Sequence, residues 1–143
     1  MTGVNKHTVE FLSQGNLIHE REFGIALGRV YDNDVFHLYF FSGSFIHMEF
    51  IDEVYAFNQE IGGHAYRNLY EFEAHVDLDP EVREWAAAPD GNKKTIADAL
   101  VVNNLAHKLL ANFYMRFNKP VKPTRIFNKR EQALKWLLQN QAN

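Results

Sequence analysis

The spacing of apolar residues changes abruptly at Ser42-Gly43-Ser44, and this change restricts the possible folds more than any other feature of the sequence. Before it, short runs such as Leu17 to Phe23 and Val35 to Phe41 carry β-branched and aromatic residues, a pattern typical of strands. After it, apolar residues recur every three or four positions and therefore share one helix face: Ile46, Phe50, Val54, Phe57 and Ile61. The chain is expected to begin as a sheet and to continue with helices.

The strands before this change are expected to pair with one another as antiparallel neighbours. Thr8 to Leu12 and Leu17 to Phe23 are short runs, and the Gly15-Asn16 pair between them is typical of a tight hairpin. Ile25 to Tyr31 is a weaker candidate for the strand that precedes the Asp32-Asn33-Asp34 turn.

Helices and strands are expected to alternate after the change. Ser44 can cap the first helix, and Gly62-Gly63 can end it. Arg67 to Val76 resembles a strand, and Asp79-Pro80 predicts the start of a short helix because proline suits the first helical turn. Thr95 to Val102 ends in an uninterrupted apolar run, as expected of a central strand that is covered on both faces.

The next predicted helix carries a continuous apolar row. Asn103 or Asn104 can cap its start, and large apolar residues recur every four positions: Leu105, Leu109, Phe113 and Phe117. The row is widened by Ala106, Leu110 and Tyr114, so we expect this helix to be substantially buried. A short strand from Thr124 to Phe127 follows, and Asn128 with Glu131 can cap a last helix.

Residues 1–143 are expected to form one domain, because no repeat, low-complexity run or linker rich in Pro, Gly or Ser divides them. A chain of this length buries roughly two-thirds of its unfolded surface and needs no disulfide, and it contains no cysteine. The predicted fold class is α/β, a mixed sheet of antiparallel N-terminal strands followed by alternating helices and strands, with about four helices.

Charge is distributed unevenly along the chain. Residues 1–104 contain 7 Lys/Arg and 17 Asp/Glu, whereas residues 105–143 contain 8 Lys/Arg and one acid, Glu131. The difference is typical of self-association, of docking to an acidic partner, or simply of two differently solvated sides. A nucleic-acid partner is not expected at a pI near 6.1. The candidate interaction surface consists of five cations: Lys119, Lys122, Arg125, Lys129 and Arg130.

Several stretches of the second half of the chain match one known family. They are Ala97 to Ala106, Ala111 to Pro120, Pro123 to Asn128 and Glu131 to Leu137. Together they make the chain, from Tyr66 to Leu138, resemble the SpoIIAA-like group of the STAS superfamily. The resemblance implies a compact STAS-like domain that binds other proteins without a cofactor and without covalent chemistry on a small substrate.

The best-known members of that group switch by phosphorylation of a Ser or Thr at the start of the helix after a central strand. The matching junction here runs from Val76 to Glu81 and contains no hydroxyl side chain. Asp77 and Asp79 are the candidate switch-equivalent residues, and Asp79 can cap the helix as an unmodified Ser would. The phosphorylation switch is therefore not expected in this chain.

Catalytic and metal chemistry find little support in the sequence. His75, Asp77 and Asp79 alternate and could share one face of a strand, but a capping role accounts for Asp79 without a metal. The three serines occupy turn-like contexts, and neither a phosphate-binding glycine loop nor a nucleophile elbow occurs. We expect no enzyme activity, no cofactor and no metal.

Aromatic residues are abundant enough to suggest a second class of function. They could enclose a small apolar ligand or lipid between sheet and helices, although core packing explains them more simply: Phe36, Phe40, Phe41, Phe45, Phe50, Tyr55, Phe57, Phe113, Tyr114 and Phe117. Aromatic side chains in excess of those that the core can hold are expected to form a dimer interface.

The sequence thus favours a non-catalytic protein-interaction or regulatory module, expected to be a homo-oligomer such as a dimer. The alternative is a carrier of a small apolar ligand. Met1 to Lys6 lacks the apolar core of a signal peptide, and His37 interrupts the longest apolar cluster, far short of the about 20 residues that span a membrane. We therefore expect a cytoplasmic protein without a membrane partner.

Overall fold

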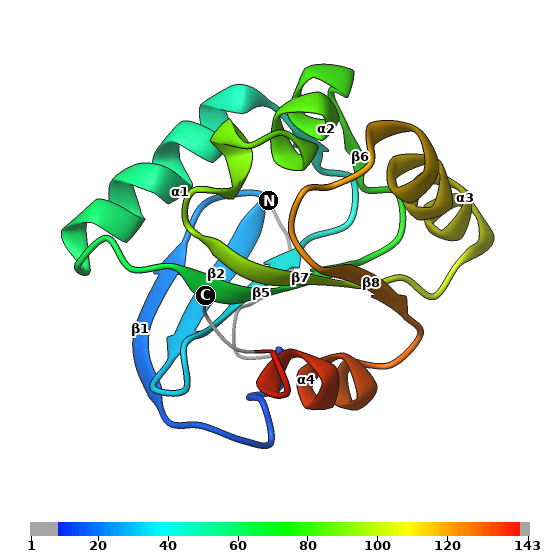
Figure 1. Ribbon diagram of the computed structural model, residues 1–143. Helices are drawn as coiled ribbons and strands as arrows, with labels where there is room; N and C mark the ends of the chain where they lie inside the picture. Colours follow the sequence, from blue (N-terminus) through cyan, green and yellow to red (C-terminus); the bar gives the residue numbers. More distant parts are fainter. Residues whose placement is uncertain (1–8, 141–143) are drawn as a thin grey trace.

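Three antiparallel strands form the first half of the main sheet (Figure 1). The computed structural model describes residues 9–140, and in it these strands are β1 (Leu17–Glu22), β2 (Ala26–Tyr31) and β3 (Val35–Phe40). Asp34 closes the turn between β2 and β3 with a positive φ of 64°, a conformation that aspartate tolerates better than most residues.

Parallel strands form the second half, each reached through a helix. β3 pairs with β5 (Tyr66–Phe72), β5 with β7 (Thr95–Val101), and β7 with β8 (Thr124–Phe127), so that the sheet order is β1-β2-β3-β5-β7-β8. A second, two-stranded sheet pairs β4 (Phe45–Ile46) with β6 (Asp77–Leu78).

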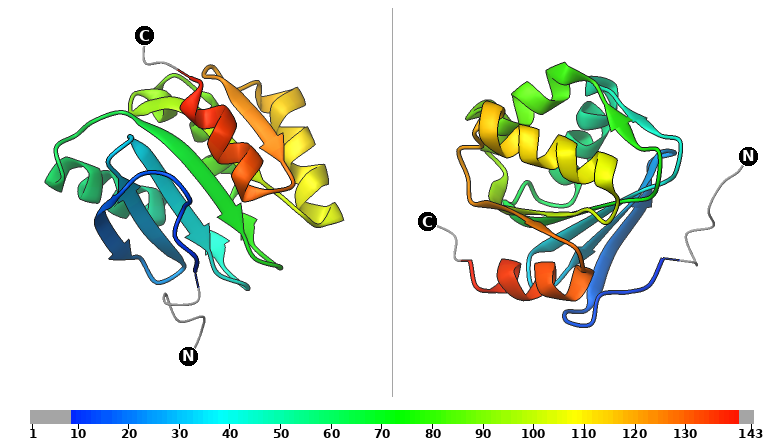
Figure 2. Two further views of the ribbon diagram at one scale, coloured as in Figure 1. Left: turned by 90° about the horizontal axis from the view of Figure 1, so that it is seen from below. Right: turned by 90° about the vertical axis from the view of Figure 1, so that its right-hand side faces the viewer.

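Helices cover both faces of the main sheet (Figure 2). One face carries α1 (Met48–Glu60), α2 (Pro80–Ala87) with the short 3₁₀ turn η2 (Asp90–Asn92), and α3 (Leu105–Phe113), which continues into the π turn η3 (Tyr114–Asn118). The opposite face carries α4 (Arg130–Leu138). The described part of the chain therefore has a three-layer arrangement with four α-helices.

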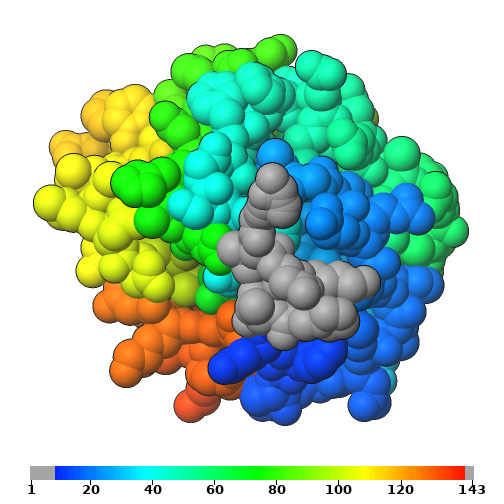
Figure 3. Space-filling model, turned by 180° about the vertical axis from the view of Figure 1, so that it is seen from behind, coloured from blue at the N-terminus to red at the C-terminus, as the bar shows by residue number. Residues whose placement is uncertain are grey.

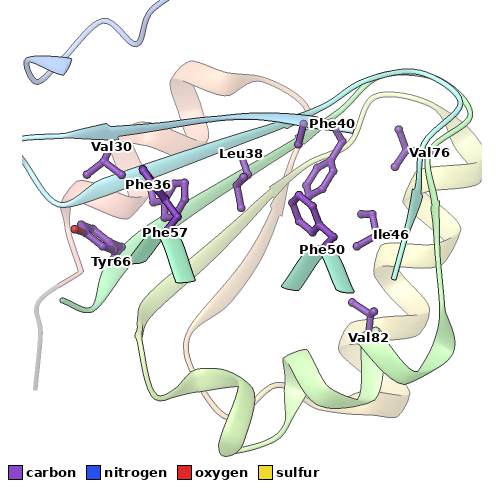
Figure 4. Packing of buried hydrophobic residues seen from close by; sticks show 11 residues of the cluster. Val30, Phe36, Leu38, Phe40, Ile46, Phe50, Phe57, Tyr66, Val76 and Val82 are labelled. Carbon is purple, nitrogen blue, oxygen red and sulfur yellow. The ribbon is translucent and has the colours of Figure 1, made fainter. Parts of the chain in front are cut away.

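Each face of the sheet has its own hydrophobic core. Under α4, the core includes Leu69 from β5, Ala97, Ala99 and Val101 from β7, and Leu134 from α4. On the other face, large side chains from β3 meet α1 and α2, as Figure 4 shows for Leu38 and Val82, which extend toward the same interior from opposite sides. Since side chains alternate along a strand, Asp98 lies on this second face.

The predicted fold class is confirmed: an α/β fold with antiparallel N-terminal strands, a mixed sheet and four helices. The weaker prediction at Ile25 to Tyr31 is also confirmed, as strand β2. The predicted helix start at Asp79-Pro80 is confirmed, as is the helix end before Gly62-Gly63.

Several local predictions are wrong, and the first concerns the residues before β1. Val9 to Leu12 is not a strand, because Leu12 donates its backbone N–H to the hydroxyl of Tyr31, and the carbonyl of Val9 accepts from the Arg29 side chain. The expected hairpin with β1 is therefore absent, and Thr8 and Met1 to Lys6 lie outside the described residues.

Ser44 does not cap α1, which begins four residues later at Met48, with His47 in the N-cap position. The residues between them, Phe45 and Ile46, form β4, whose pairing with β6 takes the place of a first helical turn. Ser44 instead donates its hydroxyl to the carbonyl of Ile25. Asn128 does not cap α4 either, because Lys129 occupies the N-cap position and makes no side-chain capping bond.

Candidate interaction surface

The apolar row of α3 and η3 faces away from the sheet. Exposed fractions are 73% for Leu105, 62% for Leu109, 45% for Phe113 and 63% for Phe117, so the expectation of a substantially buried row is wrong. The helix instead turns a narrow side with His107, Ala111 and Tyr114 toward the interior. Figure 3 shows the residues of α3, in yellow, at the outer surface of the molecule.

The position of α3 explains why the larger side chains are exposed. Its N-terminal end contacts the loop before β6, because the His107 ring forms a 3.1 Å hydrogen bond with the backbone carbonyl of Val76. Asn104 caps the helix by accepting from the backbone N–H of His107, as predicted. α3 lies at the β8 end of the sheet (Figure 1), and none of the described residues covers its outer side enough to bury the row.

The π turn keeps the row of side chains together. In a regular α-helix, residues four apart are rotated by about 40° relative to one another, so a row with this spacing drifts around the helix. A π turn contains more residues per turn and therefore reverses this drift. The rings of Phe113 and Phe117 lie side by side, with their centroids 4.6 Å apart. The result is a continuous apolar strip along one side of the helix.

Positive charge borders this strip. Lys108, Arg116 and Lys119 are exposed beside it, and among residues 9–140 none of the three forms an ion pair. The guanidinium of Arg116 lies 5.8 Å from the centroid of the Phe117 ring. We define the α3 surface as the four apolar side chains of the row together with these three cations.

The five cations predicted as an interaction surface do not lie together. Lys119 ends η3 in a left-handed conformation and belongs to the α3 surface. Lys122 is half-buried, and Arg125 extends from β8 over the ring of Phe127. Since Arg125 pairs in register with Ala99, it faces the α4 side of the sheet. Lys129 is exposed at the start of α4.

Arg130, the fifth cation, attaches α4 to the sheet. Its Nε and Nη2 donate to the two carboxylate oxygens of Glu71, at 2.8 and 3.2 Å. His37, which is buried, also shares a hydrogen bond with Glu71. Burial alone would raise the pKa of Glu71, but the hydrogen bonds with His37 and Arg130 outweigh it and lower that pKa. Arg130 therefore has a packing role here.

The Asp77–Asp79 junction has the capping geometry that the sequence predicts. The carboxylate of Asp79 accepts from the backbone N–H of Glu81 at 3.1 Å, and the proline follows at the first helical position. Asp77 is exposed, and its carboxylate accepts from the N–H of Leu78. Within residues 9–140, no three His, Asp or Glu side chains converge in a way that could hold a metal ion.

Comparisons with known proteins identify one family. The profile of a family described as Domain of unknown function (DUF7793) matches residues 30–141. No curated protein and no solved structure matches the chain. Within the described residues, no helix is both long enough and apolar enough to cross a membrane.

Proposed function

The chain belongs to the DUF7793 family, and we propose that it is a non-catalytic module that binds another protein through the α3 surface. The observation that carries this proposal is the exposed row from Leu105 to Phe117. Large contiguous apolar patches are uncommon on proteins that act alone, and aromatic side chains are the usual anchors of protein interfaces. The resemblance to SpoIIAA-like domains, which work by binding other proteins, supports the same role.

The spacing of the row favours an elongated partner. Side chains that recur along one side of a helix match the anchors of a partner helix that lies alongside. The four apolar side chains extend over more than three helical turns, so a partner segment of similar length can contact all of them.

The charge of the border favours an acidic partner. Lys108, Arg116 and Lys119 carry no ion pair among the described residues, and no acid occurs between Leu105 and Arg130. Two copies of α3 placed face to face would bring like charges together, which disfavours that dimer. A homo-oligomer built elsewhere stays a prediction. We propose a partner segment with apolar residues bordered by Asp or Glu.

The hydrogen bonds of the serine hydroxyls support a non-catalytic role. Ser13 donates to the carboxylate of Glu131, Ser42 to the carbonyl of Ala74, and Ser44 to the carbonyl of Ile25. A serine nucleophile needs an adjacent general base, usually histidine, and these three hydroxyls have other acceptors. The proposal also keeps the cytoplasm as the site of action and includes no cofactor.

A pair of synthetic peptides tests the proposal. Both are amphipathic and about 20 residues long, enough to form a helix. Both carry the same row of leucine residues along one side of the helix. The residues that border this row are glutamate in one peptide and lysine in the other. We expect the glutamate peptide to bind at least about tenfold more tightly, and the difference to shrink as salt screens the charges. Isothermal titration calorimetry measures both affinities.

Two variants locate the binding. The double substitution Leu109→Ser with Phe117→Ser removes apolar side chains from the α3 surface, whereas Ile18→Ser changes a side chain of similar exposure on β1. We expect the double variant to lose its affinity for the glutamate peptide and the Ile18→Ser variant to keep it. Equal affinity for the two peptides, or equal loss in both variants, would contradict the proposal.

A further inference from the structure

A cavity lies between the main sheet and the inner sides of α1, α2 and α3. Its volume is about 200 Å³. A cavity of roughly 150 Å³ is large enough to hold benzene, so this one has room for an aromatic ring with a few additional carbons. Most of its wall is apolar and includes Phe36 and Leu38 from β3, Phe50 from α1 and Leu110 from α3. The body of any ligand here must therefore be apolar.

A hydrogen-bonded pair of polar side chains, with Thr95 beside it, interrupts the apolar wall on the sheet side. Asn68 on β5 and Asp98 on β7 are direct neighbours in the parallel register, and both are at least nine-tenths buried. The amide of Asn68 donates to a carboxylate oxygen of Asp98 at 2.9 Å and to the hydroxyl of Thr95 at 3.3 Å. Burial raises the pKa of Asp98 to about 7. A carboxyl group thus lies in an apolar cavity with an amide as its hydrogen-bond donor.

Two further polar atoms of the wall have no hydrogen-bond partner. Asn58 on α1 is 5% exposed, and although its amide nitrogen donates to the carbonyl of His64, its Oδ1 accepts from no described residue. The Nε of Arg83 on α2 is also buried and donates to none of the described residues. Both side chains line the cavity. Buried polar atoms are nearly always paired, so these two require an explanation.

Dense core packing accounts for the aromatic side chains but not for this polar set. Purely apolar cavities in proteins are dry and contain no group that needs a partner. Here an acceptor on Asn58, a donor on Arg83 and the carboxyl of Asp98 all line one apolar space. This combination is typical of ligand sites, which are mostly apolar with a few polar groups that orient the ligand.

The mostly apolar wall disfavours a charged ligand, which would lose its hydration there, and Asp98 also repels an anion once it is ionised. A neutral group that both donates and accepts hydrogen bonds fits such a wall, and a hydroxyl does both.

We propose that the cavity binds a small neutral molecule with an apolar body and a hydroxyl group, such as a phenol or a short-chain alcohol. Its hydroxyl donates to the carboxyl of Asp98 and accepts from a wall donor. This site is separate from the α3 surface, because the row of exposed side chains lies on the opposite side of the same helix from Ala111, which lines the cavity.

Two ligands of nearly equal shape test the hydroxyl contact. 4-Propylphenol and 4-propyltoluene differ only in a hydroxyl where the other has a methyl group. At pH 8, we expect the protein to bind the phenol about tenfold or more tightly than the toluene derivative, the ratio typical of one well-placed hydrogen bond to a charged group. Titration calorimetry gives both dissociation constants. Absence of saturable phenol binding at millimolar concentration would overturn the proposal.

Variants distinguish this cavity from other sites. Asp98→Leu should make the affinities for the two ligands equal, whereas Asp77→Leu, at an exposed acid, should keep the preference. Leu110→Trp should fill the cavity and abolish both affinities, with circular dichroism confirming the fold. A hydroxyl preference that survives Asp98→Leu would overturn the role of Asp98. The α3 double variant Leu109→Ser with Phe117→Ser should bind phenol normally, so the two proposals can fail independently.

Discussion

The guanidinium of Arg83 lies 5.1 Å from the centroid of the Phe113 ring, while the same side chain lines the cavity and its buried Nε has no hydrogen-bond partner among the described residues. One side chain of α2 therefore contacts both the α3 surface and the proposed ligand site. A cation over an aromatic ring stabilises the position of that ring.

Arg83→Met tests this contact. The substitution keeps an apolar stem but removes the cation beside Phe113, so we expect it to weaken binding of the glutamate peptide several-fold, about 0.5 to 1 kcal/mol. Calorimetric titration of the variant measures the effect. Lys93→Met, at a mostly exposed cation outside the α3 surface, is the matched control and should leave the affinity unchanged.

Asp98 should make the protein less stable as the pH rises. Its pKa is about 7 in the folded protein against an ordinary value of 3.8. Between about pH 4 and 7 the folded state therefore keeps a proton that the unfolded state has lost, and the free energy of unfolding falls with rising pH. A shift of this size corresponds to an upper limit of roughly 4 kcal/mol. Tyr70 and Tyr114 nearby, whose pKa values burial raises, do not titrate in this range.

Asp98→Asn isolates this effect, because asparagine keeps an oxygen that can accept from Asn68 but cannot ionise. We expect the variant to gain stability over the parent mainly above pH 7 and little at pH 4. Urea unfolding at both pH values gives the comparison, in which the other titrating groups cancel. A gain that is the same at both pH values would be inconsistent with a buried, ionising Asp98.

Asp79→Ala should destabilise the protein by about 0.5 to 2 kcal/mol, because it removes the acceptor for the backbone N–H of Glu81. Asp79→Ser keeps a side-chain oxygen that can accept this hydrogen bond, so it should reduce the stability much less. Added zinc or magnesium should change the melting temperature of neither variant. Thermal melts of the parent and both variants, with and without metal, check this. A metal-dependent increase in the parent that both variants lose would instead indicate a site with His75 and Asp77.

Arg130→Met should destabilise the protein by about 1 to 3 kcal/mol, because Glu71 would lose two hydrogen bonds from a charged donor in a mostly buried position. Lys129→Met, next to it but exposed, should change stability by less than about 0.5 kcal/mol. Chemical unfolding of both variants measures the contrast. Equal effects would show that Arg130 does not attach α4 to the sheet.

The local pattern of the sequence determined the order and type of most elements. The change of apolar spacing at Ser42-Gly43-Ser44 separates the antiparallel strands from the alternating helices and strands. Asp79-Pro80 marks a helix start, and the apolar run that ends at Val102 marks a strand covered on both faces. These features depend on residues within one element, so they can be recognised without knowing what the element contacts.

Only the tertiary structure decided which side of each element faces the interior and which distant residues meet. α3 has apolar residues on two sides, and its place at the end of the sheet buries His107 and exposes Leu109. Asp98 interrupts an apolar strand, a visible signal in the sequence, but its partner Asn68 is 30 residues away. Arg130 and Glu71 are 59 residues apart, so their pairing depends on the packing of α4 against β5. Local spacing contains no information on such contacts, which depend on how whole elements pack.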